Sequence, residues 1–145
     1  MAKRKVRWTL RYFGKIRGPI LDRIDVCVGT RKLDTDEMRP DAKAMDSETM
    51  RGMIETAQKI QKERFGGKIL FNSQMGREEI EKFCMLDDES QKILDKAYKR
   101  FNMSARGYMK VLKVARTIAD LEGAENIGKS HVIEAINYRN TFAGR

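Results

Sequence analysis

The 145-residue sequence has only two cysteines and one histidine, which leaves little material for the usual metal sites and catalytic triads. Cys27 and Cys84 lie far apart, and neither has a Cys or His neighbour at ligand spacing, so a zinc site and a disulfide framework are not indicated. His131 has no serine or cysteine partner at a recognisable catalytic spacing. We expect no metal site, a structural role for His131, and two buried cysteines that behave as small hydrophobic residues.

Long apolar runs are also missing. No stretch approaches the roughly 20 apolar residues that a membrane-spanning helix needs, and the basic N-terminus lacks the apolar segment of a secretory signal. We therefore expect a cytoplasmic protein with no membrane partner. The length fits one domain with at most a small appendage.

Acidic residues are scarce at the N-terminus. Residues 1–23 hold eight Lys and Arg against one acid, Asp22, and so carry +7 of the formal net charge of +9. Such a segment can bind nucleic-acid phosphates by releasing counterions, and Trp8, Tyr12 and Phe13 can stack on bases. A solvated basic arm is the alternative interpretation.

From residue 46 onward, apolar residues recur at helical spacing in consecutive segments. The predicted buried stripes are Met50, Met53, Ile54, Ala57 and Ile60 in the first segment and Tyr108, Val111, Leu112, Ala115, Ile118 and Ala119 in the segment 104–122. Ser47 is the expected cap of the first helix, and Asp87 with Asp88 the expected cap of the third. Gly66 and Gly123 are expected to end the first and fourth helices. The predicted helices are 46–65, 77–84, a segment from Asp87 to a stop at Asn102, 104–122, and a last one that begins near Ser130.

The first 45 residues show a different pattern. Ile24, Val26 and Val28 alternate with polar or small residues, which predicts a strand. Residues 6–13 also alternate, although the same stretch fits a short helix. Residues 30–46 are charged and contain Pro40, which is typical of an exposed linker. The sequence therefore predicts a mainly α protein, with a helical bundle over 46–145 and a strand-containing segment over 1–45.

Residues 123–130 read G-A-E-N-I-G-K-S and fit the pattern of a phosphate-binding loop. That loop works because it follows a buried strand and opens a helix, whereas this segment follows an amphipathic helix. Glu125 would also place a negative charge within the phosphate cradle. We interpret the segment as a capped connection between two helices.

Three further motifs occur in order along the chain. Residues 18–25 read G-P-I-L-D-R-I-D, residues 104–121 contain S-A-R-G-Y and V-A-R-T-I-A-D-L, and residues 131–139 read H-V-I-E-A-I-N-Y-R. Together they resemble the magnesium-chelatase-like AAA+ ATPases over roughly residues 11–140. The similarity is greatest to the ComM and YifB branch, whose members are hexameric ATPases tied to DNA processing.

The resemblance implies that residues 46–145 are the helical lid of an AAA+ module and that residues 1–45 are the tail of its α/β core. It also implies that Arg23 is the arginine finger, which acts in trans on the ATP of a neighbouring subunit. Arg106 corresponds to the sensor-2 arginine, which contacts the γ-phosphate in its own subunit, and the small residues Ala105 and Gly107 beside it are expected to leave room for nucleotide. A planar, permanently charged guanidinium suits this task because phosphoryl transfer spreads charge over the γ-oxygens. Arg116 and Arg139 are expected to be structural.

Other expectations also come from the resemblance. The phosphate-binding loop and the magnesium-binding acid of the family lie upstream of the matching region, so the isolated chain is not expected to hydrolyse ATP. ATP and Mg²⁺ are expected only beside an intact core, and the implied partners are that core and the neighbouring subunits of a ring, with DNA a candidate partner of the basic N-terminus. Arg17 stands where the family usually has Ser, and Lys110 and Lys113 replace arginines. The alternatives are a small basic nucleic-acid-binding protein without an ATPase role and an interaction module that docks on a full-length partner.

Overall fold

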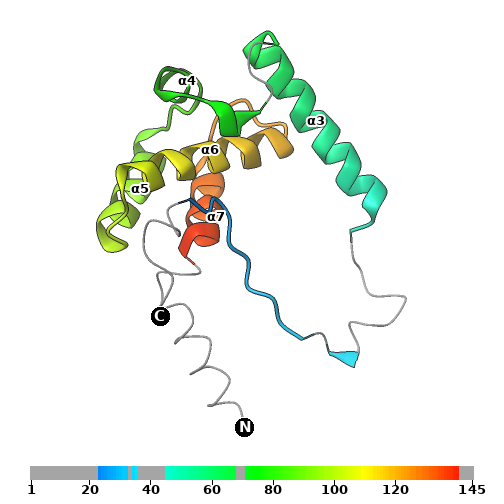
Figure 1. The fold of residues 1–145 in the computed structure, drawn as a ribbon, viewed down its shortest axis with the longest axis horizontal. Coiled ribbons are helices and arrows are strands. Elements are labelled where there is room, and N and C mark those ends of the chain that lie inside the picture. The colour runs from blue at the N-terminus through cyan, green and yellow to red at the C-terminus, as the bar shows by residue number, and fades with distance from the viewer. Residues whose placement is uncertain (1–22, 33, 36–44, 68–70, 141–145) are drawn as a thin grey trace.

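The structure is a computed structural model that describes residues 23–32, 34, 35, 45–67 and 71–140. The described part is mainly helical, as predicted (Figure 1). None of its helices is long and apolar enough to cross a membrane. Its elements are α3 (Ser47–Phe65), the 3-10 helix η2 (Asn72–Gln74), α4 (Arg77–Phe83), α5 (Asp88–Arg100), α6 (Ala105–Leu121) and α7 (Lys129–Asn140).

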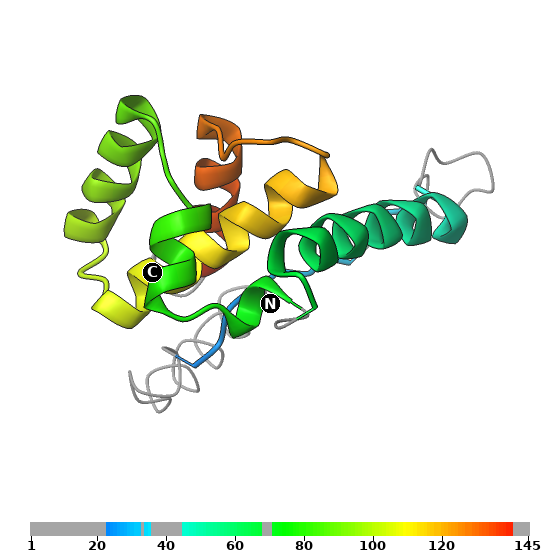
Figure 2. The same cartoon turned by 90° about the horizontal axis from the view of Figure 1, so that it is seen from above.

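The core is organised around α6, which lies in the middle of the bundle (Figures 1 and 2). This helix packs against α7, α3, η2 and α4, while α5 packs against α7. The predicted apolar stripe of α6 is buried, with Val111 and Ala115 almost fully so. Leu94 of α5 and Val132 of α7 are completely buried beside it. Full burial of one such side chain stabilises a fold by about 1.5–3 kcal/mol.

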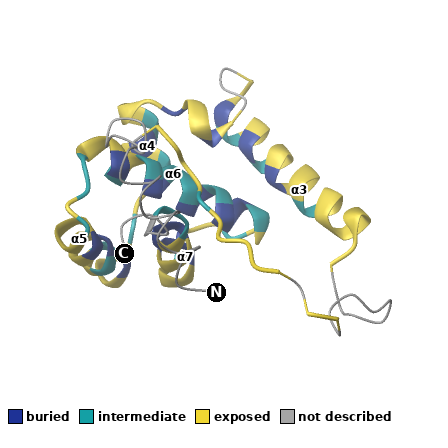
Figure 3. Ribbon diagram, turned by 60° about the horizontal axis from the view of Figure 1, so that its bottom comes forward, coloured by how far each residue is buried: buried dark blue, intermediate teal, exposed yellow. Residues whose placement is uncertain are grey.

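Helix α3 contributes to this core through only part of its length. Its buried residues, Ala57, Gln61 and Phe65, lie in its C-terminal half. Met50 and Ile54, in the other half, are exposed although they belong to the predicted apolar stripe. Figure 3 shows this half projecting beyond the bundle.

The helices begin at side chains that accept backbone hydrogen bonds. Asp46, and not Ser47 as predicted, caps α3 and accepts the Thr49 N–H at 2.7 Å. Asp87 caps α5 as predicted and accepts the Ser90 N–H at 2.7 Å. These bonds lower the pKa of both carboxyl groups. The stability that the two capping aspartates contribute is therefore fully present above the ordinary aspartate pKa. It is lost as the pH falls through the lowered pKa of each group.

The predicted helix ends also agree with the backbone. Gly66 and Gly123 follow α3 and α6 with φ of +57° and +68°, in the left-handed region that a glycine adopts without a Cβ clash. Asn102, after α5, has φ of +46°, which asparagine tolerates better than most residues.

The prediction of a strand at residues 24–28 is wrong for the described part of the chain. The segment is extended but does not pair with a strand, because its polar groups are bonded to α7 instead: the Cys27 N–H donates to the Tyr138 carbonyl at 3.0 Å. The one β-type contact among the described residues is a single parallel bridge between Leu86 and Ile127. The other strand candidate, residues 6–13, lies outside the described residues.

The two cysteines differ in environment. Cys84 is buried in the core, and this burial raises the pKa of its thiol to about 11. Cys27 is only half-buried; burial raises the pKa of its thiol as well, and the nearby charge of Arg139 opposes that shift. The prediction that both cysteines are buried is right for Cys84 alone.

Candidate functional site

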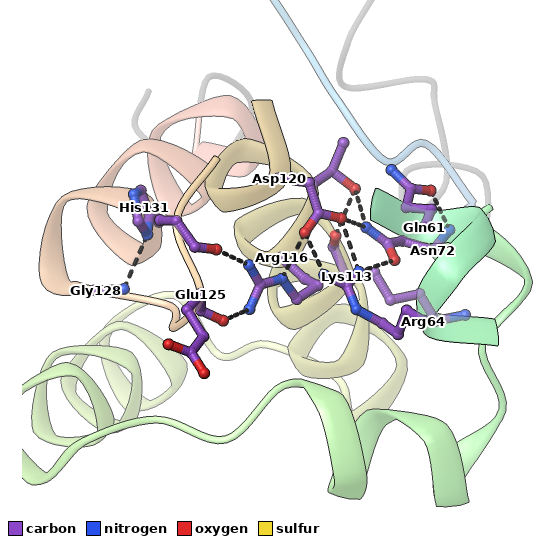
Figure 4. A network of polar contacts seen from close by, with 11 residues as sticks. Gln61, Arg64, Asn72, Lys113, Arg116, Asp120, Glu125, Gly128 and His131 are labelled. Carbon is purple, nitrogen blue, oxygen red and sulfur yellow. Dashed lines mark hydrogen bonds and ion pairs between the residues drawn. The ribbon is translucent and has the colours of Figure 1, made fainter. Parts of the chain in front are cut away.

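A buried polar network joins α3, η2 and α6 (Figure 4). Its centre is Asp120, whose side chain is 0% exposed. Arg64 Nη1 and Asn72 Nδ2 donate to Asp120 Oδ2 at 2.8 and 2.7 Å, and Arg116 Nε donates to Oδ1 at 3.0 Å. Because a buried carboxylate is stable only when paired and hydrogen-bonded, these donors are a condition for burying Asp120 at all.

Arg116 uses its remaining donors to close the connection between α6 and α7. Its Nη1 donates to the Glu125 carbonyl at 2.8 Å and its Nη2 to the Ala124 carbonyl at 2.6 Å. With its side chain 3% exposed, this guanidinium is fully engaged by the protein. The structural role predicted for Arg116 is confirmed.

Sequence reasoning missed the other half of the network. Asn72 accepts a hydrogen bond from Arg64 Nη1 at 3.0 Å, and its N–H donates to Gln61 Oε1 at 2.9 Å. An arginine and an aspartate one turn apart in an apolar helix, Arg116 and Asp120, were the available signal. Nothing in the sequence pointed to their partners, which precede α6 by several elements.

The segment that fits the phosphate-loop pattern, residues 123–130, joins α6 to α7 as predicted. Its lysine, Lys129, pairs with Glu89 of α5 at 2.5 Å. The Gly128 N–H donates to His131 Nδ1 at 2.9 Å, so Nε2 carries the ring proton and lies 2.8 Å from a Glu122 carboxylate oxygen. His131 thus secures the start of α7, in agreement with its predicted structural role.

We expect the isolated chain to bind Mg-ATP only weakly, because this segment joins two helices and two of its groups that would hold phosphate, the Lys129 ammonium and the Gly128 N–H, are bonded to the protein. Isothermal titration should give the same weak binding for wild type and for Lys129→Ala. Lys92→Ala, which removes another exposed lysine, is the matched control. Submicromolar binding that Lys129→Ala abolishes and Lys92→Ala does not would establish a phosphate site there.

The two arginines predicted to act on nucleotide are both exposed. Arg23 lies in a turn at the start of the described residues, and Arg106 is the second residue of α6. Neither side chain has a hydrogen bond or ion pair to another described residue. Each is thus presented to solvent, in contrast to Arg116.

The segments that carry these two arginines meet at a third arginine, Arg139. Its Nη1 donates to the carbonyl of Ile24, the residue after Arg23, at 3.3 Å. Its guanidinium also lies against Gly107, the residue after Arg106, where an added Cβ would be 2.8 Å from Nη2. The space above Gly107, which the sequence suggested was left for nucleotide, is therefore occupied by Arg139.

A lysine strengthens the link between the same segments. Lys110 of α6 pairs with Asp25 at 2.8 Å, and its side chain is 12% exposed. Lys113, one turn further along α6, donates to the Ser73 carbonyl at 2.9 Å and has no part in this link. Lys110 and Lys113 stand where the magnesium-chelatase-like AAA+ ATPases have arginines, and both lysines make structural contacts.

The charge around these contacts is mainly positive. Arg139 and Lys110 contact the segment after Arg23, and Asp25, the acid in these contacts, is paired with Lys110. The N-terminus of the 17-residue helix α6 adds its positive partial charge beside Arg106. In the described part of the chain, no group of three or more His, Cys, Asp or Glu side chains is arranged to hold a metal ion. An exposed guanidinium at the N-terminus of a helix is chemically suited to a phosphate group.

The class of protein follows from comparison with known families. Residues 44–139 match the family described as "Magnesium chelatase, subunit ChlI C-terminal", and the chain belongs to this family. Within it, the chain corresponds to the C-terminal portion of the ComM- and YifB-like proteins.

Two curated relatives illustrate the similarity. The chain is 36% identical over 131 residues to "Competence protein ComM" of Haemophilus influenzae, a match that covers 90% of this chain and 25% of the relative. It is 33% identical over 132 residues to "Uncharacterized protein YifB" of Salmonella typhimurium, covering 90% of this chain and 26% of the relative. The chain thus spans about a quarter of the length of these relatives.

Proposed function

We propose that this chain supplies the lid and two catalytic-site arginines of a ComM-like AAA+ ATPase. In this proposal Arg23 is the arginine finger and Arg106 is the sensor-2 arginine. The observation that carries it is the contrast among the arginines: each nitrogen of the Arg116 guanidinium is bonded to the protein, whereas Arg23 and Arg106 are exposed and unpaired among the described residues. A guanidinium that is kept for a phosphate must be free of stronger protein partners.

The two arginines have different tasks in this proposal. Arg106, at the positive end of α6, contacts the γ-phosphate of ATP held by the core of its own subunit. Arg23 reaches the ATP of the neighbouring subunit and stabilises the charge that spreads over the γ-oxygens in the transition state. In line with the family resemblance, we propose that the upstream core holds Mg²⁺ and that the isolated chain does not hydrolyse ATP.

Assembly, substrate and location belong to the same proposal. An arginine that acts in trans requires a neighbouring subunit, and we propose that the subunits form a hexameric ring in the cytoplasm. The name of the Haemophilus relative refers to competence, and DNA processing is the proposed context. The concentration of positive charge in residues 1–23 keeps direct nucleic-acid binding as a second candidate. DNA binding by the isolated chain that weakens steeply with salt would favour it.

A graft tests the proposed function. This chain should restore ATP hydrolysis when it replaces the matching quarter of the Haemophilus relative, behind that protein's remaining sequence. Coupled-enzyme assays would measure turnover, with the truncated relative as the negative control and its intact form as the positive control. Rings that assemble and bind ATP but turn over no faster than the truncated relative would contradict the proposal.

A further inference from the structure

Polar contacts fix the segment that follows Arg23 to the helical bundle. Asp25 pairs with Lys110 of α6, and the Cys27 N–H donates to the Tyr138 carbonyl of α7. Ile24, Val26 and Val28 have exposed side chains, and the Asp25 side chain is itself 62% exposed. Hydrogen bonds and charge, not apolar burial, therefore determine the position of the segment.

Three contacts hold it within four consecutive residues. Arg139 donates to the Ile24 carbonyl, Lys110 pairs with Asp25, and the Cys27 N–H donates to the Tyr138 carbonyl. We call these contacts the latch. They bind one short segment to two helices at once, so a movement of α6 and α7 carries the segment with it.

Each latch contact has a physical reason in the structure of the helices. The Tyr138 carbonyl belongs to the last turn of α7, where carbonyls have no partner within the helix, and Cys27 supplies the missing donor. Lys110, at 12% exposure, is largely withdrawn from water and gains its counter-charge from Asp25. Gly107 leaves the space in which the Arg139 guanidinium lies, since a Cβ there would collide with it.

We propose that Lys110 of α6 and Arg139 of α7 are positioning residues that fix Arg23 to these two helices, of which α6 carries Arg106, so that the two arginines move as one body. Arg23 directly precedes the first latched residue, which limits how far it can move independently. The inference rests on the proposed function for what the two arginines do. Its consequence is that γ-phosphate contact by Arg106 in one site is transmitted to the finger presented to the next site.

The latch can be measured in the full chain, without ATP or a core. We expect the {¹H}–¹⁵N NOE of residues 24–27 to match that of α6 in the wild type. In Lys110→Met and in Arg139→Gln it should fall towards the values of a mobile segment. Exchange of the Cys27 amide should become roughly two- to fivefold faster when the Lys110 ion pair is lost, as expected for one partly exposed pair. Lys113→Met, one turn further along α6, is the matched control and should change neither.

Two further measurements separate positioning from general stability. The thermal midpoint of the helices should fall no further in Lys110→Met and Arg139→Gln than in the Lys113→Met control, and the same holds for Asp25→Asn, which breaks the ion pair from its exposed side. The charge reversal Asp25→Lys combined with Lys110→Asp should restore the wild-type NOE, while each single reversal lowers it.

Mobile residues 24–27 in the wild type would overturn the inference, and so would a loss of order that occurs only together with a lower thermal midpoint. Because these measurements involve no nucleotide, their outcome is independent of the graft. An inactive graft with an ordered latch would refute the proposed function and leave the latch standing, whereas an active graft with a mobile segment would do the reverse.

Discussion

Replacing Arg23 by alanine in the grafted ring is expected to lower ATP turnover by about 10³–10⁵-fold, the range known for arginine fingers, with ATP affinity nearly unchanged. The reason is that a finger acts on charge that develops only in the transition state. Arg106→Ala should weaken both turnover and ATP binding, because a sensor contacts the γ-phosphate already in the ground state. Turnover and nucleotide affinity, measured separately, distinguish the two roles. Arg77→Ala, which removes an exposed arginine paired with Glu81, is the control and should leave both unchanged.

Mixing the two inactive variants tests the assignment to different subunits. A mixed ring contains interfaces at which an intact Arg23 from one subunit meets an intact Arg106 from its neighbour, so part of the activity should return. This expectation is compatible with the latch, which joins the two arginines of one chain mechanically while they serve adjacent sites. Mixed rings without recovery, despite confirmed co-assembly, would show that both arginines serve one site from one chain or that neither is catalytic.

The largest loss of stability is expected from Asp120→Ala, which should lower the free energy of unfolding by about 3–5 kcal/mol. The substitution leaves two largely buried guanidinium groups, Arg64 and Arg116, without their shared counter-charge. It also removes an acceptor from Asn72, so α3 and η2 lose their polar attachment to α6. Urea unfolding of the full chain followed by circular dichroism measures the change.

Glu81→Ala is the matched control for Asp120→Ala. It also removes a carboxylate paired with an arginine, but Glu81 and Arg77 are 64% and 80% exposed. An exposed pair contributes only about 0–1 kcal/mol because water and salt screen it. Equal losses in the two variants would contradict the view that the buried network holds α3 and η2 on α6.

The buried network shows which contacts a sequence pattern can predict and which it cannot. The heptad-like stripe of α6 predicted which of its faces is buried, and the structure confirms this. A structural role was predicted for Arg116, but the sequence pattern did not single out Asp120, which lies one turn further along α6. Their mutual pairing was accessible from spacing, but the contribution of Arg64 and Asn72 depends on how α3 and η2 pack against α6, which no local pattern encodes.

The candidate site was predicted from motifs and not from apolar periodicity. The motif resemblance selected Arg23 and Arg106, and their roles remain predictions. The meeting of their segments at Arg139 could not be predicted, because Ile24 and Arg139 are at opposite ends of the described chain. Gly107 suggested free space from its size alone, and the structure fills that space with a side chain from α7.

The sequence by itself determined the helices and their ends, because apolar periodicity, capping aspartates and left-handed glycines act within a few residues of the positions they control. The one-residue difference between Ser47 and Asp46 arises because both residue types can cap a helix. Only the tertiary structure decided which partners residues 24–28 bind. Alternation predicts that one side of a segment differs from the other, but hydrogen-bond partners are chosen by proximity in the folded chain, and here the partners are the ends of helices.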